Sequence, residues 1–270
     1  MATYTRPPAV AGRFYPNNPE TLLRDVQTYM SAGGDKLRAL GCVAPHAGYM
    51  YSGHVAGAVY ARLELPKTFI ILCPNHTGVG QPLAIMSDAR WMTPLGDVAV
   101  NSELASALKR QFPALTDDIQ AHQMEHALEV QLPFLQALAR DFSFVPIAVG
   151  TSRFEMLEKL GDAMASVIEG LPERPLIIAS SDMNHYDPDQ VTREKDHKAI
   201  ETILTLDTRG LYDVVTQEGV SMCGFGPAIA MLTAAKRLGA KSAQVIKYAT
   251  SGDVSGDREM VVGYAGIAVL

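Results

Sequence analysis

The sequence has no cluster of basic residues and no long apolar run. Its 23 lysines and arginines are scattered among 29 acidic residues, for a net charge of −6, so no segment is suited to following a nucleic-acid backbone. No apolar stretch approaches the length of a membrane span, and the N-terminal "MATYTRPPAV" lacks the apolar core of a signal peptide. We therefore expect no nucleic-acid partner, no membrane segment and a cytoplasmic location.

Cysteine is also scarce. Cys42, Cys73 and Cys223 are widely spaced and form no C-x-x-C pair, which agrees with a cytoplasmic location. A buried apolar role suffices for Cys42, inside an apolar run. Cys223, in "SMCGFGP", comes immediately before a predicted helix, whose positive end would lower the thiol pKa and favour the thiolate.

Apolar strands alternate with helices along the chain. The pattern predicts strands at 40–44, 68–73, 82–86, 96–100, 142–150, 175–180, 243–250 and 261–270. Helices are predicted at 19–30, 53–63, 101–112, 125–139 (with a kink near Pro133), 153–170, 193–205, 207–217 and 226–239. The central predicted strands are continuously apolar, which is typical of buried parallel strands. Because these strands alternate with evenly spread helices, we predict one α/β domain over residues 1–270 with a largely parallel sheet.

Three histidines follow buried strands. His46 comes after "GCVA", His76 after "FIILC" and His185 a few residues after "LIIAS". Ligands of such sheets bind beyond the carboxyl ends of the strands, and imidazole is the commonest metal ligand. If the strands are parallel and adjacent, the three imidazoles meet at one edge of the sheet.

Two histidines and one anionic ligand, with open positions, commonly hold redox metals. The spacing alone leaves four candidates for the anionic ligand: Asp182, Glu125, Glu129 and Cys223. A hydrolase with Cys223 as nucleophile and a strand-end histidine as base is a further alternative, but the sequence has no G-x-S-x-G segment.

A competing pattern is "HQMEH", residues 122–126, which matches the H-x-x-E-H signature of zinc peptidases. On one continuous helix His122 and His126 would share a zinc ion, with Glu125 as base. The preceding "PALTDDIQA" has no apolar periodicity, so we expect the helix to begin near Glu125 and His122 to lie on a loop.

The chain resembles the Memo family, protein B of the AmmeMemoRadiSam system, from about residue 7 to its end. The matching segments follow the family's order: "PPAVAGRFYP", "APHAGYMYSG", "CPNHTG", "EHALEVQLPFL", "SSDMNHY", "MCGFGP" and "YATSGDVSGD". The family is similar in fold to class III extradiol ring-cleaving dioxygenases, which implies a three-layer α/β/α sandwich around a mixed sheet. AMMECR-type and radical-SAM proteins of the same system are the implied partners.

The resemblance also implies a site. His46 and His76 match the family's metal-binding histidines, and Cys223 matches a thiolate ligand that replaces the carboxylate of the dioxygenases. Asp182 and His185 match a polar pair of the family pocket. His126 and Glu129 match its "EHxxE" segment, which leaves out His122.

Our hypothesis is a non-haem metal enzyme, with Fe(II) first and Cu or Zn as alternatives, acting on a small substrate such as an aromatic diol. His185 would transfer protons, oriented by a hydrogen bond that it donates to Asp182. Further residues expected at the substrate pocket are Tyr49, Tyr51, His126, Glu129, Ser251 and Asp253. The alternative is a binding module for a phosphopeptide or small anion, in which Arg13 would meet the anion.

Overall fold

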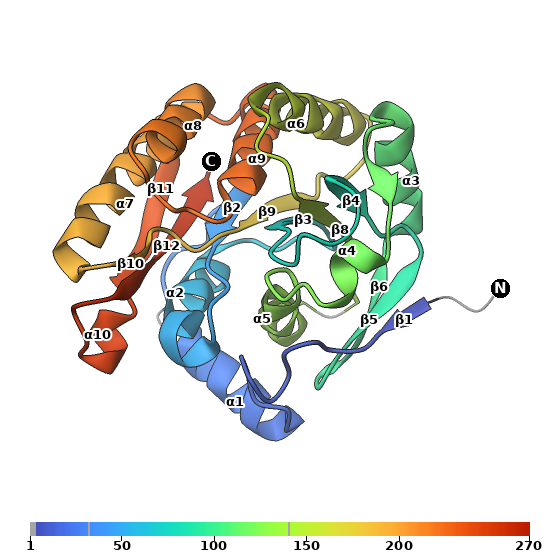
Figure 1. Ribbon diagram of the computed structural model, residues 1–270. Helices are drawn as coiled ribbons and strands as arrows, with labels where there is room; N and C mark the ends of the chain where they lie inside the picture. The colour runs from blue at the N-terminus through green and yellow to red at the C-terminus, as the bar shows by residue number, and fades with distance from the viewer. Residues whose placement is uncertain (1–3, 32, 140) are drawn as a thin grey trace.

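The centre of the fold is a block of four parallel apolar strands. The computed structural model describes residues 4–31, 33–139 and 141–270 (Figure 1). In it the neighbouring strands are, in order, β8 (Ser143–Val149), β3 (Thr68–Pro74), β9 (Leu176–Ser180) and β2 (Gly41–Ala44). All three pairs are parallel, and almost every residue is buried because both faces are covered.

Further strands extend this block on both sides. β12 (Val261–Val269) pairs antiparallel with β2, and β11 (Ala243–Thr250) and β10 (His185–Asp187) pair antiparallel with β12. On the other side lie β6 (Gly96–Val100), β5 (Ala89–Thr93), β1 (Tyr4–Arg6), β4 (Leu83–Ile85) and β7 (Thr116–Asp117). The sheet is therefore mixed, as predicted.

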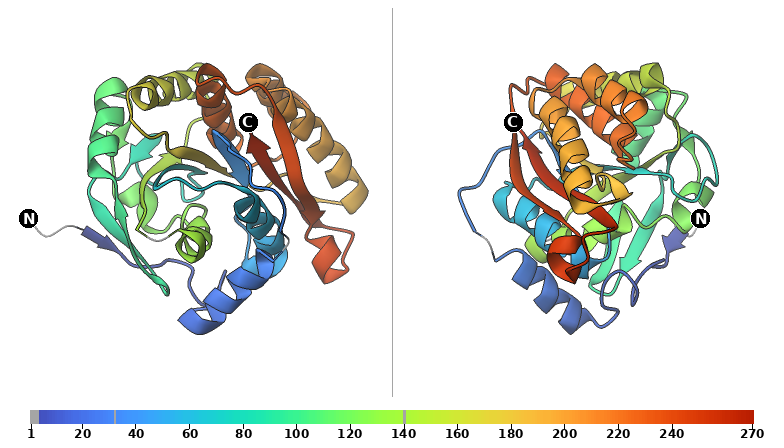
Figure 2. Two further views of the ribbon diagram at one scale, coloured as in Figure 1. Left: turned by 180° about the vertical axis from the view of Figure 1, so that it is seen from behind. Right: turned by 60° about the vertical axis from the view of Figure 1, so that its left-hand side comes forward.

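Helices cover both faces of the sheet (Figure 2). One layer holds α3 (Ser102–Gln111), α6 (Phe154–Glu169), α7 (Asp189–Leu204), α8 (Thr208–Gln217) and α9 (Phe225–Arg237). The other holds α1 (Pro19–Tyr29), α2 (Tyr49–Arg62) and α5 (Leu132–Leu138). Successive residues of β3 point to opposite faces of the sheet. Ile70 packs in the core below the layer with α6 and α9, and Ile71 packs in the core below the layer with α1 and α2. The three-layer α/β/α sandwich is confirmed.

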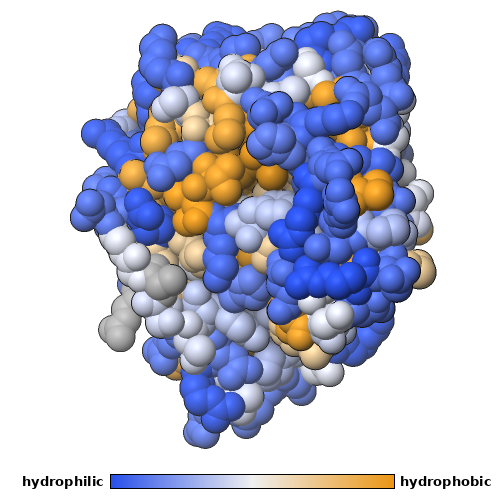
Figure 3. All heavy atoms as spheres, turned by 90° about the vertical axis from the view of Figure 1, so that its left-hand side faces the viewer, coloured by the Kyte–Doolittle hydropathy of each residue, from blue (hydrophilic) through white to orange (hydrophobic). Residues whose placement is uncertain are grey.

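β11 is an edge strand, since among the described strands it pairs only with β12. Figure 3 looks at the side of the molecule with α7, α10 (Gly252–Ser255) and β11, where apolar side chains gather on part of the surface. A register shift between Val245 and Lys247 interrupts the strand. A bulge and a lysine on an edge strand hinder pairing with another chain.

The predicted segment 125–139 is the main disagreement. It is not one kinked helix: residues 125–126 have no regular structure, a turn follows at 127–128, and then come a 3₁₀ turn at Glu129–Gln131 and α5. Pro133 lies in the first turn of α5, where its missing N–H has no helical partner to lose. α2 begins at Tyr49, earlier than expected, and β1, β5, β7 and β10 were not predicted. No helix among the described residues is both long enough and apolar enough to cross a bilayer.

Candidate metal centre

The three strand-end segments meet at one edge of the sheet. β3, β9 and β2 are adjacent and parallel, so their carboxyl ends lie side by side. His46 follows β2, His76 follows β3 and Asp182 follows β9, each two residues after its strand ends. The predicted convergence of the histidines is confirmed: the rings of His46 and His76 are 5.1 Å apart between centroids, and His185 lines the same cavity.

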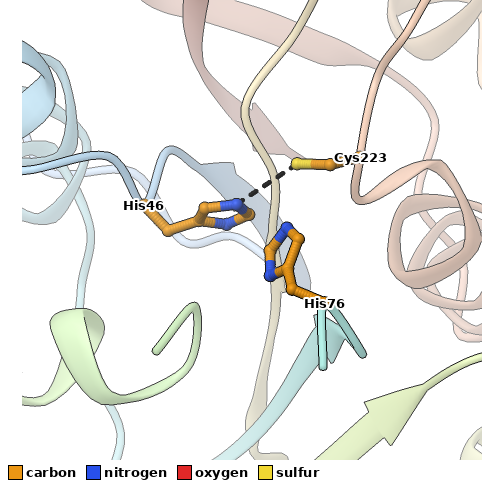
Figure 4. A group of neighbouring side chains, drawn as sticks. All are labelled: His46, His76 and Cys223. Carbon is orange, nitrogen blue, oxygen red and sulfur yellow. Dashed lines mark hydrogen bonds between the residues drawn. The ribbon is translucent and has the colours of Figure 1, made fainter. Parts of the chain in front are cut away.

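Cys223 joins them from the loop before α9 (Figure 4). Its Sγ is 3.2 Å from His46 Nε2, and donor atoms of His46, His76 and Cys223 all lie within 4.8 Å of one another. Gly224 allows this approach, because a Cβ at that position would lie 2.3 Å from the carbonyl oxygen of Ser180. Two imidazoles and a thiol are thereby brought together from three distant parts of the chain.

His46 is held in one tautomer by Ser180. The Ser180 hydroxyl donates to the carbonyl of Ala127 at 2.6 Å and accepts from Gln131 Nε2 at 2.8 Å. It lies 3.0 Å from His46 Nδ1 and, with its one hydrogen already used, it can only accept there. Nδ1 therefore carries the proton, and Nε2 presents its lone pair toward Cys223.

His76 is held in the same tautomer by Glu125. Its Nδ1 donates to the fully buried Glu125 carboxylate at 2.9 Å, and its backbone N–H donates to the other oxygen at 2.6 Å. Burial lowers the pKa of His76, but the Glu125 carboxylate outweighs it and the net shift is upward. Glu125, considered above as a ligand or a peptidase base, thus lies behind a histidine, as is usual around protein metal sites.

His185 is oriented by Ser221, which corrects our expectation for Asp182. The Nδ1–H of His185 donates to the Ser221 carbonyl at 2.9 Å, and its backbone N–H donates to Ser221 Oγ at 2.8 Å. Asp182 instead accepts the backbone N–H of His46 at 2.7 Å. Burial lowers the pKa of His185, so its ring is neutral with Nε2 unprotonated.

Burial also shifts the two acidic groups of the site. It raises the pKa of Asp182 to about 7, although the backbone N–H groups of His46 and Ala47 oppose the shift. Burial and the nearby Asp182 raise the pKa of the Cys223 thiol, so the expected lowering by the helix N-terminus is wrong for the chain without a metal. A bound cation reverses this balance, because a coordinating thiol is deprotonated. The donor set of two neutral imidazoles and one thiolate fits Fe(II), Cu or Zn.

A cavity of about 500 Å³ opens in front of these groups. Besides the three candidate ligands it is lined by Phe14, Ala47, Gly48, His126, Asp182, His185, Tyr186, Ser221 and Val262. The ring of His126 stacks on that of His76, with centroids 4.8 Å apart. His76, Glu125 and His126 also group within 4.8 Å, but both oxygens of Glu125 already accept hydrogen bonds.

Two residues expected at the pocket lie in the core instead. Tyr49 is buried and donates its hydroxyl to the carbonyl of Val130 at 2.6 Å. Glu129 is fully buried in an ion pair with Arg6 and accepts the hydroxyl of Tyr15 at 2.6 Å. Both hold the layer below the site together rather than face the cavity.

Three more expected pocket residues lie outside the cavity lining. Tyr51 packs against a small cluster that includes Tyr264. Ser251 Oγ accepts the backbone N–H of Val262 at 3.0 Å, and Asp253 forms an ion pair with Arg193 at 2.9 Å.

The H-x-x-E-H segment does not form a continuous helix. His122 lies in α4 (Gln120–Gln123), not on a loop as expected, and this helix ends before Glu125. His122 is fully buried against Trp91, with Nδ1 2.9 Å from the carbonyl of Asp118. Among the described residues, no potential metal-binding group includes His122.

Comparison with known proteins identifies similar chains. A family model described as Memo-like protein matches residues 6–268. A MEMO1 family protein of Methanopyrus kandleri is 44% identical over 276 residues, covering 97% of this chain and 98% of the relative. A MEMO1 family protein of Methanosarcina mazei is 45% identical, and the match covers 98% of this chain and 98% of the relative. A MEMO1 family protein of Pyrobaculum aerophilum is 42% identical, and the match covers 97% of this chain and 98% of the relative.

Proposed function

The chain belongs to the Memo family, and from that premise we propose that it is a metal-dependent, dioxygenase-like oxidoreductase. Its metal ligands would be His46, His76 and Cys223, with Fe(II) as the first candidate and Cu or Zn as alternatives. The substrate would be a small oxygen-bearing molecule. A bound redox metal with open positions would supply electron transfer between substrate and O₂.

The observation that carries the proposal is the shared tautomer of the two ligand histidines. Ser180 accepts a hydrogen bond from the Nδ1–H of His46, and Glu125 accepts one from the Nδ1–H of His76. Each ring therefore offers an Nε2 lone pair, and the Cys223 sulfur lies 3.2 Å from one of them. A histidine that binds a metal through one ring nitrogen normally donates a hydrogen bond from the other ring nitrogen to a protein group.

The residues around the ligands support proton transfer. His185 is neutral, lines the cavity and has its Nδ1–H fixed by Ser221, so its free Nε2 can accept a proton from a substrate hydroxyl. Asp182, with a pKa of about 7, can hold a proton at neutral pH beside the same cavity.

Metal analysis of protein purified without oxygen tests the proposal. Wild-type protein is expected to hold about one metal ion per chain, and His46→Ala, His76→Ala and Cys223→Ala to lose it. His197→Ala is the matched control, because that side chain is 72% exposed on α7. His122→Ala should also keep the metal, whereas a zinc peptidase site would lose it.

Metal analysis together with a phosphopeptide-binding assay distinguishes the proposed enzyme from the alternative binding module. Among the described residues that line the cavity there is no lysine or arginine, although phosphate is usually recognised by such side chains. Protein that takes up none of the three metals and still binds phosphopeptide would contradict our proposal and favour the binding module.

A further inference from the structure

Tyr186 combines an unfavourable backbone conformation with an exposed aromatic ring. Its φ is 63°, in the left-handed region that bulky residues rarely adopt. The residue is 68% exposed and yet lines the cavity, with its ring centroid 5.6 Å from that of His185. Strained backbone of this kind persists only where the surrounding structure enforces it, and it is concentrated at functional sites.

The residues on both sides of Tyr186 enforce this conformation. His185 is bound to Ser221 through its ring and its backbone N–H. The Asp187 carboxylate accepts from Asn184 Nδ2 at 2.8 Å and from Lys195 Nζ at 2.7 Å.

The pairing of β10 with β12 explains where the ring goes. His185 pairs with Val262 and Asp187 with Val261, so Tyr186 is an extra residue with no partner across the ladder. Such bulges redirect a side chain next to active sites. Here the redirected side chain lies at the cavity that also contains the candidate ligands.

We propose that Tyr186 is a specificity-determining residue, whose ring forms an aromatic wall for a planar part of the substrate. This inference rests on the proposed metal function. The apolar side chains of Phe14 and Val262 line the same cavity, which adds surface suited to an apolar group. The substrate class is therefore a small molecule with an oxygen-bearing head for the metal and a flat, aromatic body.

Two hydroxamates test this, because benzohydroxamate and acetohydroxamate share the metal-chelating head and differ in the phenyl ring. Calorimetric titration of metal-loaded protein gives the ratio of their Kd values. We expect Tyr186→Asn, which tolerates the left-handed backbone without the ring, to reduce the preference for benzohydroxamate by about three- to tenfold. Tyr186→Phe should keep the preference, and so should Met50→Ala, an exposed side chain outside the cavity lining.

Thermal unfolding gives a second readout. Glycine adopts this φ without strain, so Tyr186→Gly should raise the Tm by about 2–4 °C and also lose the preference for benzohydroxamate. If Tyr186 were needed only for stability, Tyr186→Gly would lower the Tm and keep the preference for benzohydroxamate.

The outcomes separate the two proposals. Unchanged preference in both Tyr186→Asn and Tyr186→Gly would overturn the aromatic wall and leave the metal function standing. Failure of wild-type protein to load metal, or of both hydroxamates to bind the loaded protein, would overturn the metal function and this inference with it.

Discussion

The Nδ1–H of His46 donates to the hydroxyl of Ser180 at 3.0 Å, across the ends of the neighbouring strands β2 and β9. The hydroxyl has no second hydrogen to offer, because it already donates to the carbonyl of Ala127. Ser180, at the end of β9, thus determines that His46, after the neighbouring strand β2, presents its Nε2 to the cavity.

Removing this hydroxyl should weaken metal binding without unfolding the chain. We expect Ser180→Ala to lower metal affinity by about 10–100-fold, the usual effect of losing a partner behind a metal ligand. Competition with a coloured chelator measures the affinity. Ser31→Ala, which removes an exposed hydroxyl outside the cavity lining, is the control. Equal affinities for the two variants would contradict the role of Ser180.

Neutralising Glu125 should change both the metal affinity and the pKa of His76. In Glu125→Gln the negative charge that raises the pKa of His76 is gone, so this pKa should fall. NMR titration of the imidazole in metal-free protein measures it. Metal affinity should fall by about 10–100-fold as well. A pKa that stays the same or rises would show that Glu125 is not ionised beside the ring.

The buried pair of Arg6 and Glu129 should matter for stability rather than chemistry. Both side chains are fully buried, and Glu129 also accepts the backbone N–H of Ala9 at 2.7 Å. Breaking such a pair leaves an uncompensated buried charge, so Glu129→Gln should lower the free energy of unfolding by about 3–5 kcal/mol. Urea denaturation measures the loss. A change below about 1 kcal/mol would contradict it, and Glu20→Gln on the exposed first turn of α1 is the control.

Asp196 should make stability depend on pH. Burial raises its pKa to about 7, although Tyr248 and the backbone N–H of Asn184 oppose the shift. The folded chain then holds this proton more tightly than the unfolded chain, whose aspartate titrates near pH 4. The stabilisation is full below about pH 4 and is lost as the pH rises to about 7.

Replacing Asp196 removes this titration. Urea unfolding between pH 4 and 8 should show a decline in wild-type stability through that window. The decline should be smaller in Asp196→Asn, which keeps only the part contributed by Asp182, whose pKa is also about 7. Parallel curves for the two proteins would show that Asp196 keeps an ordinary pKa in the fold.

The sequence predicted where the two candidate ligand histidines lie, but not the groups that hydrogen-bond their second ring nitrogens. His46 and His76 follow apolar runs whose short length and composition favour buried strands, and the rule for parallel sheets brings such positions together. Ser180 and Glu125 act through contacts between segments far apart in the chain, and no local pattern encodes which nitrogen they bind. Glu125 was considered as a ligand and as the base of a peptidase signature, but not as a group that binds His76 from behind; the signature requires a continuous helix, whereas α4 ends at Gln123.

Backbone conformation accounts for most of the other differences. Pro133 predicts a kink only if the helix already exists before it, whereas here it starts the helix. Tyr186 follows His185 in a segment with no strand pattern, so neither the bulge nor the exposed ring could be foreseen. The pKa of Cys223 depends on the burial of its thiol and on the nearby Asp182 carboxylate. Neither the burial nor this proximity can be read from the sequence around Cys223.

Anomalous diffraction from crystals of metal-loaded protein would locate the bound metal and its ligands. Data collected at the iron, copper and zinc edges should show one peak bound by His46 Nε2, His76 Nε2 and Cys223 Sγ, with metal–sulfur and metal–nitrogen distances of about 2.3 and 2.1 Å. A peak held by His122 and His126, or a fully loaded protein whose Cys223 points away from the metal, would contradict the account.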